Sequence, residues 1–448
     1  MIRFLFALQI STIFPAVLVA QISVADKIFP DFLLSAEKTL ENAEALSKSL
    51  FSEDRARENL RLRKAPRLPS LQSFAQYHYQ TEQFDQPTGD QDSERFLYGL
   101  TLRQPLYHWG ALKANHEVGQ ILLQTAQQNT ETLRTLLRNE LQRRALGYYI
   151  AIRENQFAQT NLRHYSRLLE QAESSNEQGV ISLTELETAR QNHRNSTQHQ
   201  ISTLTAKLSI HHRLLKDFSL PEEQLDEIPE ELPMDLPIDI ETWEQRVQDF
   251  TTSGYLDHPE YQVVLSNIEV QEKHIDIAKA GNRPLVDLVV GANQDDTTYM
   301  LSQLDDRFRQ IYYAGIRVNW RIFDGHATQA RIKTAETNLD QAKQQKQYIA
   351  LKLAQDARQS LHEIQNAEVR LRLLEQTLET RTKRHEQTKA SHENGQVPDT
   401  ELANSAFDLA YHQHLYHVEY ARAISHLLYA ELLTTLKVKH PKKVLHEK

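Results

Sequence analysis

The sequence of 448 residues contains no cysteine and only 12 glycines. Without cysteine there are no disulfides, no thiolate metal sites and no cysteine nucleophiles. Hydrophobic residues make up 40% of the chain and charged residues 25%, which excludes a disordered or fibrous protein. The formal net charge of −9 provides no basic surface of the kind that nucleic acids require, so we expect no nucleic-acid partner.

Motifs of catalysis are also missing. The sequence has no G-x-x-x-x-G-K, no G-x-S-x-G and no H-E-x-x-H. Its best candidate ligands are histidines, because two of them three residues apart on a helix can bind zinc, but no third ligand is visible. We therefore predict no enzyme, no cofactor and no metal site, with a metal-dependent periplasmic enzyme as an alternative. The histidines are His412, His414 and His417, and the pair His211 and His212.

The first 25 residues have the pattern of a secretory signal peptide. Arg3 precedes an apolar stretch, and small residues follow it from Ser23 to Ala25. The alternative is an N-terminal membrane anchor, although Gln9 and Pro15 interrupt the apolar run. No later run of 18 apolar residues exists, so we expect no membrane-spanning helix.

The rest of the chain is a duplication with a step of 216 residues. We predict a first repeat over 26–220, an acidic proline-rich linker over 221–239, a second repeat over 240–437 and a C-terminal tail over 438–448. Residues repeated at this step include Gly99 and Gly315, Tyr107 and Phe323, Gly179 and Gly395, and Glu185 and Glu401.

Long stretches without proline, and nearly without glycine, predict long helices in both repeats. They are rich in Ala, Gln, Lys and Glu with spaced Leu and Ile, which is typical of a coiled coil with a narrow apolar seam. The longest would measure about 100 Å. The predicted helices span about 110–176, 182–218, 325–393 and 399–437.

Four short segments alternate apolar and polar residues and predict strands at about 70–80, 95–105, 285–294 and 308–321. A soluble half-buried sheet has the same alternation, but their length also suits tilted strands in a membrane. Four strands cannot close a barrel, so two chains would give eight strands and three would give twelve. The side chains assigned to lipid are Phe96, Tyr98, Leu100, Leu102, Val286, Leu288, Val290, Tyr312, Ile316, Val318 and Trp320.

At the far ends of the long helices, one glycine in each repeat predicts a hairpin tip. A glycine can take the left-handed conformation that ends a helix, and capping residues open the next helix a few positions later. An ordinary loop between antiparallel helices would use the same residues. The two tips comprise Gly179, Val180, Ile181, Ser182 and Thr184, and Gly395, Gln396, Val397, Pro398 and Thr400.

Several motifs in this order resemble the TolC-like outer-membrane efflux proteins over nearly all of the mature chain. They are "HPEYQVVLSNIEVQEKHIDIAKAGNRPLVDL", the junctions "GLTLRQPLYHWG" and "GIRVNWRIFDGH", and the two glycine tips followed by Thr-Glu-Leu. The resemblance implies an α+β membrane protein of Gram-negative bacteria. It would be a homotrimer with a twelve-stranded β-barrel in the outer membrane, four strands per chain, continued by a long α-helical coiled-coil tunnel through the periplasm.

The same resemblance implies a function and partners. The protein would be the passive exit duct of a tripartite efflux or type I secretion system, in contact with outer-membrane lipid, and its tips would dock to a periplasmic adaptor and an inner-membrane transporter. It places an aperture near Glu185, Glu401, His392 and Asn404. Trp109 and His326 depart from the family pattern, as do Val397 and Asn404, where Arg and Asp can occur. The alternative function is a soluble or surface coiled-coil scaffold.

Overall fold

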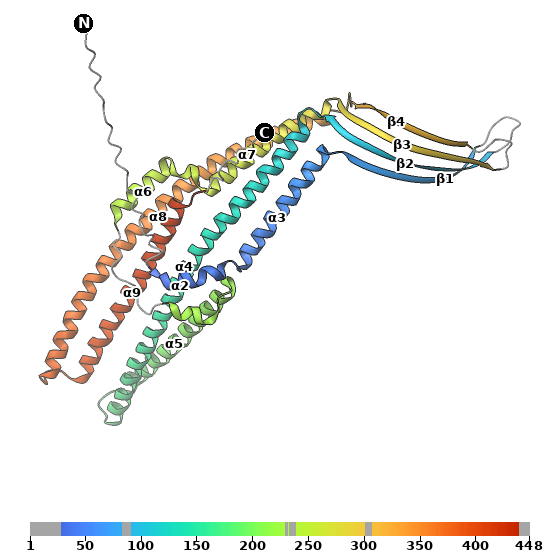
Figure 1. Cartoon of the computed structure of the whole chain (residues 1–448). Helices are drawn as coiled ribbons and strands as arrows, with labels where there is room; N and C mark the ends of the chain where they lie inside the picture. Colours follow the sequence, from blue (N-terminus) through green and yellow to red (C-terminus); the bar gives the residue numbers. More distant parts are fainter. Residues whose placement is uncertain (1–27, 83–90, 229–231, 233–238, 301–306, 439–448) are drawn as a thin grey trace, which may run out of the picture.

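The computed structural model describes residues 28–82, 91–228, 232, 239–300 and 307–438. The molecule is elongated, with a β-sheet at one end and two helical hairpins at the other (Figure 1). The predicted signal peptide over 1–25 lies outside the described residues, and so does nearly all of the predicted tail over 438–448.

Each copy of the duplication has the same order of elements: a helix, two strands, a helix of 67 residues and a shorter returning helix. Each copy begins with a short helix that was not expected from the sequence, α2 (Pro30–Leu40) in the first and α6 (Ile240–Thr252) in the second. The first copy contains α3 (Glu44–Lys64), β1 (Ser70–Glu82), β2 (Gln91–Tyr107), α4 (Ala111–Glu177) and α5 (Leu183–Phe218). The second contains α7 (Pro259–Lys279), β3 (Leu285–Met300), β4 (Arg307–Asn319), α8 (Ala327–Glu393) and α9 (Asp399–Thr435).

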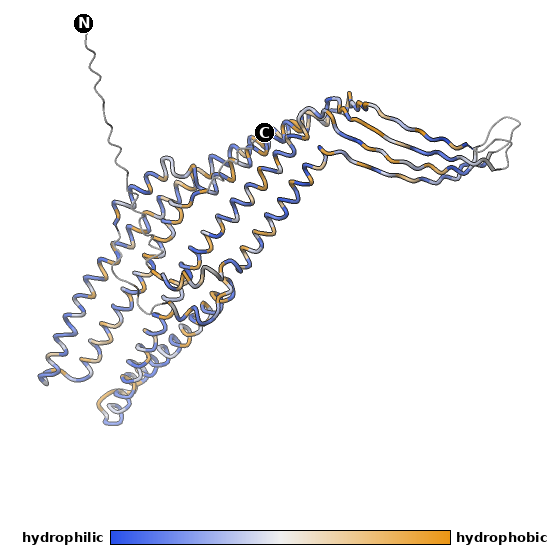
Figure 2. The backbone as a smooth tube through the Cα atoms, viewed as in Figure 1, coloured by the Kyte–Doolittle hydropathy of each residue, from blue (hydrophilic) through white to orange (hydrophobic). Residues whose placement is uncertain are grey.

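The long helices bury narrow seams, as the coiled-coil texture of the sequence indicates. Along α8 the buried positions recur at intervals of seven, and later of three and four residues, while small side chains allow neighbouring helices to approach closely. Apolar and polar residues accordingly alternate along these helices in Figure 2. The buried series on α8 includes Ala335, Ala342, Ile349, Leu353, Ala357, Ile364, Ala367 and Leu371.

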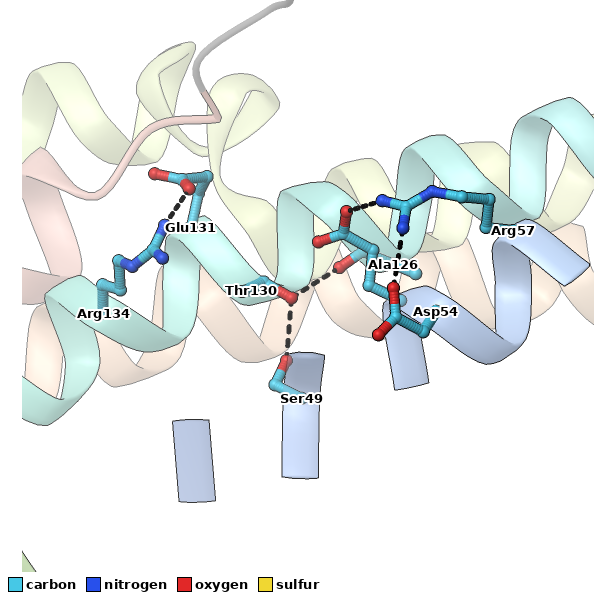
Figure 3. A network of polar contacts seen from close by, with 8 residues as sticks. Ser49, Asp54, Arg57, Ala126, Thr130, Glu131 and Arg134 are labelled. Carbon is cyan, nitrogen blue, oxygen red and sulfur yellow. Dashed lines mark hydrogen bonds and ion pairs between the residues drawn. The ribbon is translucent and has the colours of Figure 1, made fainter. Parts of the chain in front are cut away.

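The shorter helices pack along the long ones. Ser49 on α3 lies with its Oγ 2.9 Å from Oγ1 of Thr130 on α4, which also donates to the carbonyl of Ala126 at 3.1 Å (Figure 3). On the exposed side of α3, Arg57 donates to Asp54 and Glu53. In the second copy α7 packs on α8 in the same way, with Lys352 on α8 and Glu260 on α7 3.0 Å apart. The two copies therefore share one packing plan.

The largest core lies in the middle of the molecule, where α2 crosses the long helices (Figure 1). Phe29, the N-cap of α2, and Phe32, within α2, are almost fully buried, and Leu225 and Ile228 from the predicted linker pack in the same cluster. Part of that linker forms a 3-10 helix, η2 (Glu222–Glu227), because prolines exclude a regular α-helix there. The described part of the linker is thus held in the core by its apolar residues.

The sheet has the order β1-β2-β3-β4 with all neighbours antiparallel. β2 and β3 join the two copies, with an irregularity between Pro105 and Tyr107. Strands β1 to β3 run further toward the loops than predicted, because polar residues occupy both faces there, as at Asp295 to Thr298, and hide the alternation. β4 ends at Asn319, two residues before the predicted end. Separately, none of the described helices is long and apolar enough to cross a membrane.

Candidate functional site

The register of the sheet determines which side chains share a face. Leu100 lies opposite Ser73 on β1 and Ala292 on β3, and Ala292 lies opposite Tyr312 on β4. Directly opposed residues point to the same face. By this register ten of the side chains assigned to lipid share one face: Phe96, Tyr98, Leu100, Leu102, Val286, Leu288, Val290, Tyr312, Ile316 and Val318. Trp320 directly follows the end of β4.

This shared face, called the apolar face below, is open in the single chain. Its large side chains are 60 to 78% exposed at Leu71, Tyr77, Phe308, Tyr312, Ile316 and Val318. A continuous apolar surface of this kind is rare on monomers in water, so it marks a place that lipid or another protein covers.

The opposite face, called the polar face, carries ion pairs that join the two copies. Arg95 donates to Asp295 through Nε at 2.7 Å and Nη2 at 2.5 Å. Arg103 Nε donates to Asp287 Oδ2 at 2.9 Å, and His108 Nε2 lies 2.9 Å from the other oxygen. The side chain of Asp287 is only 1% exposed, so these partners neutralise its charge.

Two glycines on the polar face, Gly99 and Gly291, are required by close approach. A Cβ at Gly291 would lie 2.4 Å from the ring of Tyr313, which covers it. The Tyr313 hydroxyl then reaches Thr101 Oγ1 at 3.0 Å on β2. A larger side chain at Thr101 would therefore disturb the packing of Tyr313 over Gly291.

Two tryptophans fix the junction between sheet and helices. The indole Nε1 of Trp109 donates to the carbonyl of Pro284 at 2.8 Å, and the guanidinium of Arg283 lies 4.8 Å from its ring centroid. Trp320 Nε1 donates to the carbonyl of Asn282 at 3.0 Å. Aromatic residues gather at such levels where a membrane meets water. The sequence indicated Trp109 only as a departure from a family pattern, because its partner lies in the other copy.

The first hairpin tip closes α4 onto α5 with a left-handed glycine. Gly179 has φ of 73°, and its N–H donates to the carbonyl of Asn176 at 2.9 Å. The N–H of Val180 donates to the carbonyl of Ser175 at 2.8 Å, which completes a Schellman motif. Val180 and Leu183 are more than 70% exposed, so the tip presents apolar side chains to solvent.

The helix after this tip begins with a capping box. Ser182 Oγ accepts from the N–H of Glu185 at 3.3 Å, and Glu185 Oε2 accepts from the N–H of Ser182 at 2.7 Å. Donation from the backbone N–H and the hydroxyl of Ser182 lowers the pKa of Glu185. The carboxylate assigned to the aperture is thus bound by the start of its own helix. The spacing Ser-x-x-Glu in the sequence is the signal that predicts this arrangement.

The second tip has the same backbone bonds. Gly395 has φ of 71°, and its N–H donates to the carbonyl of His392 at 2.8 Å. The N–H of Gln396 donates to the carbonyl of Ser391 at 2.9 Å. The duplication has therefore kept the Schellman motif in both copies.

The cap that follows is different in the second tip. Pro398 is the N-cap of α9, and no side chain accepts a bond from the first turn. Instead His392 spans the turn, with Nδ1 3.0 Å from the carbonyl oxygen of Val397 and Nε2 3.1 Å from Oδ1 of Asp399. A histidine contact between the two helices replaces the carboxylate cap of the first tip.

The other residues predicted for the tips and aperture lie in the turns or in the following helix. Glu401 and Asn404 are exposed on α9, and within the described chain neither contacts Glu185. The aperture set therefore does not gather within one chain. The remaining tip residues lie within the two turns or in the first helical turn after them: Ile181, Thr184, Gln396, Val397 and Thr400.

The histidines of α9 belong to helix packing. The ring of His414 stacks on Phe157 of α4 with centroids 4.7 Å apart, and burial lowers its pKa to about 4. His412 Nδ1 lies 2.8 Å from the carbonyl of Asp408. In the ranges that the structure describes, no group of three His, Cys, Asp or Glu residues could hold a metal ion.

Comparisons with solved structures show where else this fold occurs. The outer-membrane channel OprN superposes with a TM-score of 0.72 at 17% identity, covering 91% of each chain. The Campylobacter jejuni CmeC outer membrane channel gives 0.70 at 13% identity, covering 92% of this chain and 87% of that one. VceC, an outer membrane protein of Vibrio cholerae, gives 0.69 at 13% identity, covering 91% of this chain and 97% of that one.

No curated protein is similar enough in sequence to match this chain. The family profile described as "Outer membrane efflux protein" matches residues 36–216 and 257–423, which is well over half of the chain. The two matched segments contain most of both long hairpins, including their tips, and the first includes β1 and β2 while the second includes β3 and β4. The chain belongs to the outer membrane efflux protein family.

Proposed function

We propose that three copies of this chain close a twelve-stranded barrel and form the exit duct of an export machine. Membership of the family makes the protein an outer-membrane efflux channel, with its helices in the periplasm of a Gram-negative bacterium. The observation that supports a closed barrel is the sheet itself, which has an apolar face and two unpaired edges.

Both edges need a partner in lipid. Among the described strands, β1 pairs only with β2 and β4 only with β3, so a row of backbone N–H and C=O groups stays open on each side. An unsatisfied backbone group in the hydrocarbon costs several kcal/mol, and only closed barrels avoid this cost for strands.

Copies of the chain can satisfy these edges by a head-to-tail ring. Because the four strands alternate in direction, β4 of one copy runs antiparallel to β1 of a copy related by rotation. Each copy then adds four strands to the barrel and one pair of long hairpins to the tunnel. Three copies give twelve strands, the number that the family resemblance implies.

The tips are the parts of the helices furthest from the sheet, so they are the natural contact with partners across the periplasm (Figure 1). Val180 and Leu183 are exposed apolar residues at the end of the first hairpin. We assign this surface to a periplasmic adaptor, which links the duct to an inner-membrane transporter of an efflux or type I secretion system.

The aperture is assigned to the same end. Glu401 has no capping partner among the described residues, whereas Glu185 is held by Ser182, so Glu401 is the freer of the two carboxylates. In a trimer, three Glu401 carboxylates would repel one another and favour cation binding. His392 and Asn404 would lie near this ring.

Detergent dependence and particle size test the proposed function. We expect the protein to remain in the membrane fraction until detergent is added and then to run as a trimer, with pores in planar bilayers. A monomer that is soluble without detergent would contradict the channel and favour the scaffold alternative.

A further inference from the structure

Charged residues on the sheet are sorted between its two faces. All arginines of the strands lie on the polar face: Arg95, Arg103, Arg307, Arg309 and Arg317. Among the side chains that the structure describes on that face, the carboxylates are Asp287 and Asp295. The described polar face therefore carries more positive than negative charge.

Burial and pairing increase this excess. Asp287 is 1% exposed and bound by Arg103 and His108, and Asp295 is 18% exposed and bound by Arg95. Neither carboxylate projects a free negative charge into the space in front of the sheet. The arginines of β4 are exposed, and within the described chain Arg309 and Arg317 form no ion pair.

Closure of the barrel would not neutralise these arginines. This step rests on the proposed function, because it places β1 of the next copy beside β4. From Ser70 to Gln80 the side chains of β1 on the polar face are uncharged or histidine: Ser70, Gln72, Phe74, Gln76, His78 and Gln80. The next residue on this face is Glu82, the last residue of β1, at the loop end of the sheet. The neighbouring copy thus brings no carboxylate to the end of β4 that holds Arg317, whereas Glu82 belongs to the loop end, where Arg309 lies.

The arginines of β4 lie at two levels along the strand. Arg309 and Arg317 are eight residues apart, which corresponds to roughly 27 Å along a strand. Near Arg309, the acids Glu94 and Asp296 lie on the opposite face of the sheet and weaken the field.

On the polar face itself each arginine lies directly opposite an acid, Arg317 opposite Asp287 and Arg309 opposite Asp295. Asp287 is the more deeply buried of the two and is already bound by Arg103 and His108, and the opposite face beside Arg317 has Ile316 and Val318. The level of Arg317, beside the helices, is therefore the more positive one.

We propose that Arg317, repeated by the copies of a closed barrel, forms an anion-binding ring in the lumen beside the helical tunnel, with Arg309 as a second ring nearer the loops. A narrow polar space lined by one sign of charge concentrates counter-ions, and rings of arginine favour anions in pores. The planar guanidinium also matches carboxylate and phosphate groups. The cargo that passes this section most readily is an anionic compound.

Block by an inorganic polyanion tests the ring. Tripolyphosphate is added to single channels in planar bilayers at low salt, where charge effects are least screened. We expect wild-type current to be blocked, and Arg317→Gln to weaken the block about tenfold, which corresponds to about 1.4 kcal/mol. Arg317→Lys keeps the charge and should keep most of the block. Arg61→Gln removes an exposed charge that is paired with Glu58 in the last turn of α3, outside the strands, and should change nothing.

The outcomes separate this inference from the proposed function. Channels that conduct but are blocked equally in wild type and Arg317→Gln would overturn the anion ring and leave the channel intact. Channels whose block is lost equally in Arg61→Gln would show a general charge effect and also overturn it. If wild-type protein purified in detergent gave no conductance in planar bilayers, that result would instead contradict the proposed function, on which the ring depends.

Discussion

The sheet and the hairpin tips lie at opposite ends of the long helices, and the two copies of the duplication behave differently at each end. In the sheet the copies are paired through β2 and β3, so the apolar and polar faces continue across both. At the tips each copy folds on itself. The backbone is repeated there, with φ of 73° and 71° at the glycines, while the caps have diverged. Pairing between strands therefore constrains the side chains of the sheet. At the tips the glycine turn is kept, but the capping side chains differ.

The largest expected effect is on the sheet. Leu100→Arg places a charge in the middle of the apolar face and should cost about 2 to 4 kcal/mol near the membrane midplane, whereas Val318→Arg, next to the junction with the helices, should cost about 0 to 1 kcal/mol. Gln72→Arg and Asn319→Arg are matched neighbours on the polar face and should be tolerated. The measurement is barrel stability in lipid against urea.

Equal damage on both faces would show that the assigned faces are wrong. Thr101→Arg is a poorer control, because the Thr101 hydroxyl contacts Tyr313 over Gly291.

At the tips the largest effect should come from the glycines. No atom lies within 4 Å of a Cβ built at Gly179 or Gly395, so Ala there is opposed only by the left-handed backbone, at about 1 to 2 kcal/mol. Gly147 is a matched control inside α4, where Ala also has space and favours the helix. Hydrogen exchange of the tip amides should rise roughly tenfold in the first two variants only. Unchanged exchange in both would contradict the backbone account.

A smaller effect should distinguish the two tips. Ser182→Ala removes the capping box and should weaken the start of α5 by about 1 kcal/mol. Pro398→Ala is the matched change at α9, where no side chain caps the helix, so little should be lost. Hydrogen exchange of the first amides of α5 and α9 compares the two variants. An equal rise in both would mean that the two helix starts do not differ in capping energy.

The smallest effect should be a pH dependence of the first tip. The folded pKa of Glu185 lies below its usual value of 4.5, so its contribution is present above that value and is lost as pH falls through the folded pKa. Exchange at the start of α5, corrected for the intrinsic rate, should therefore rise in acid. Glu185→Gln should remove this pH dependence, and its persistence in that variant would assign it to another group.

Periodicity explains how much of the fold the sequence predicts. Alternation in the strands and the lack of proline in the long helices are local patterns, so they indicate the four strands and four of the helices. The contacts of Phe29 and Phe32 with Leu225 and Ile228 depend on residues nearly 200 positions apart, and no local pattern indicates them. For the same reason the sequence missed α2 and the core position of the linker.

The candidate site divides in the same way. The alternation of apolar and polar residues in the strands predicts the apolar face. The two glycine turns are predicted because glycine can take the left-handed conformation. The bond from Trp109 to the carbonyl of Pro284 joins the two copies and could not be read from either. The capping box at Ser182 and Glu185 was readable, because its spacing is a known helix-start pattern. Its presence leaves Glu401 as the one of the two carboxylates predicted for the aperture that has no capping partner among the described residues.

Cross-linking between β1 and β4 tests the central claim most directly, because a cysteine-free chain allows single pairs to be introduced cleanly. Within one chain these edges are separated by two strands, roughly 14 Å, which is beyond the reach of a disulfide. Cysteine at Ala75 combined with cysteines scanned over 310–318 should, in at least one register, give covalent products up to three chains and no larger. A chain that stays monomeric at every register, or forms an unlimited ladder, would contradict the closed trimeric barrel.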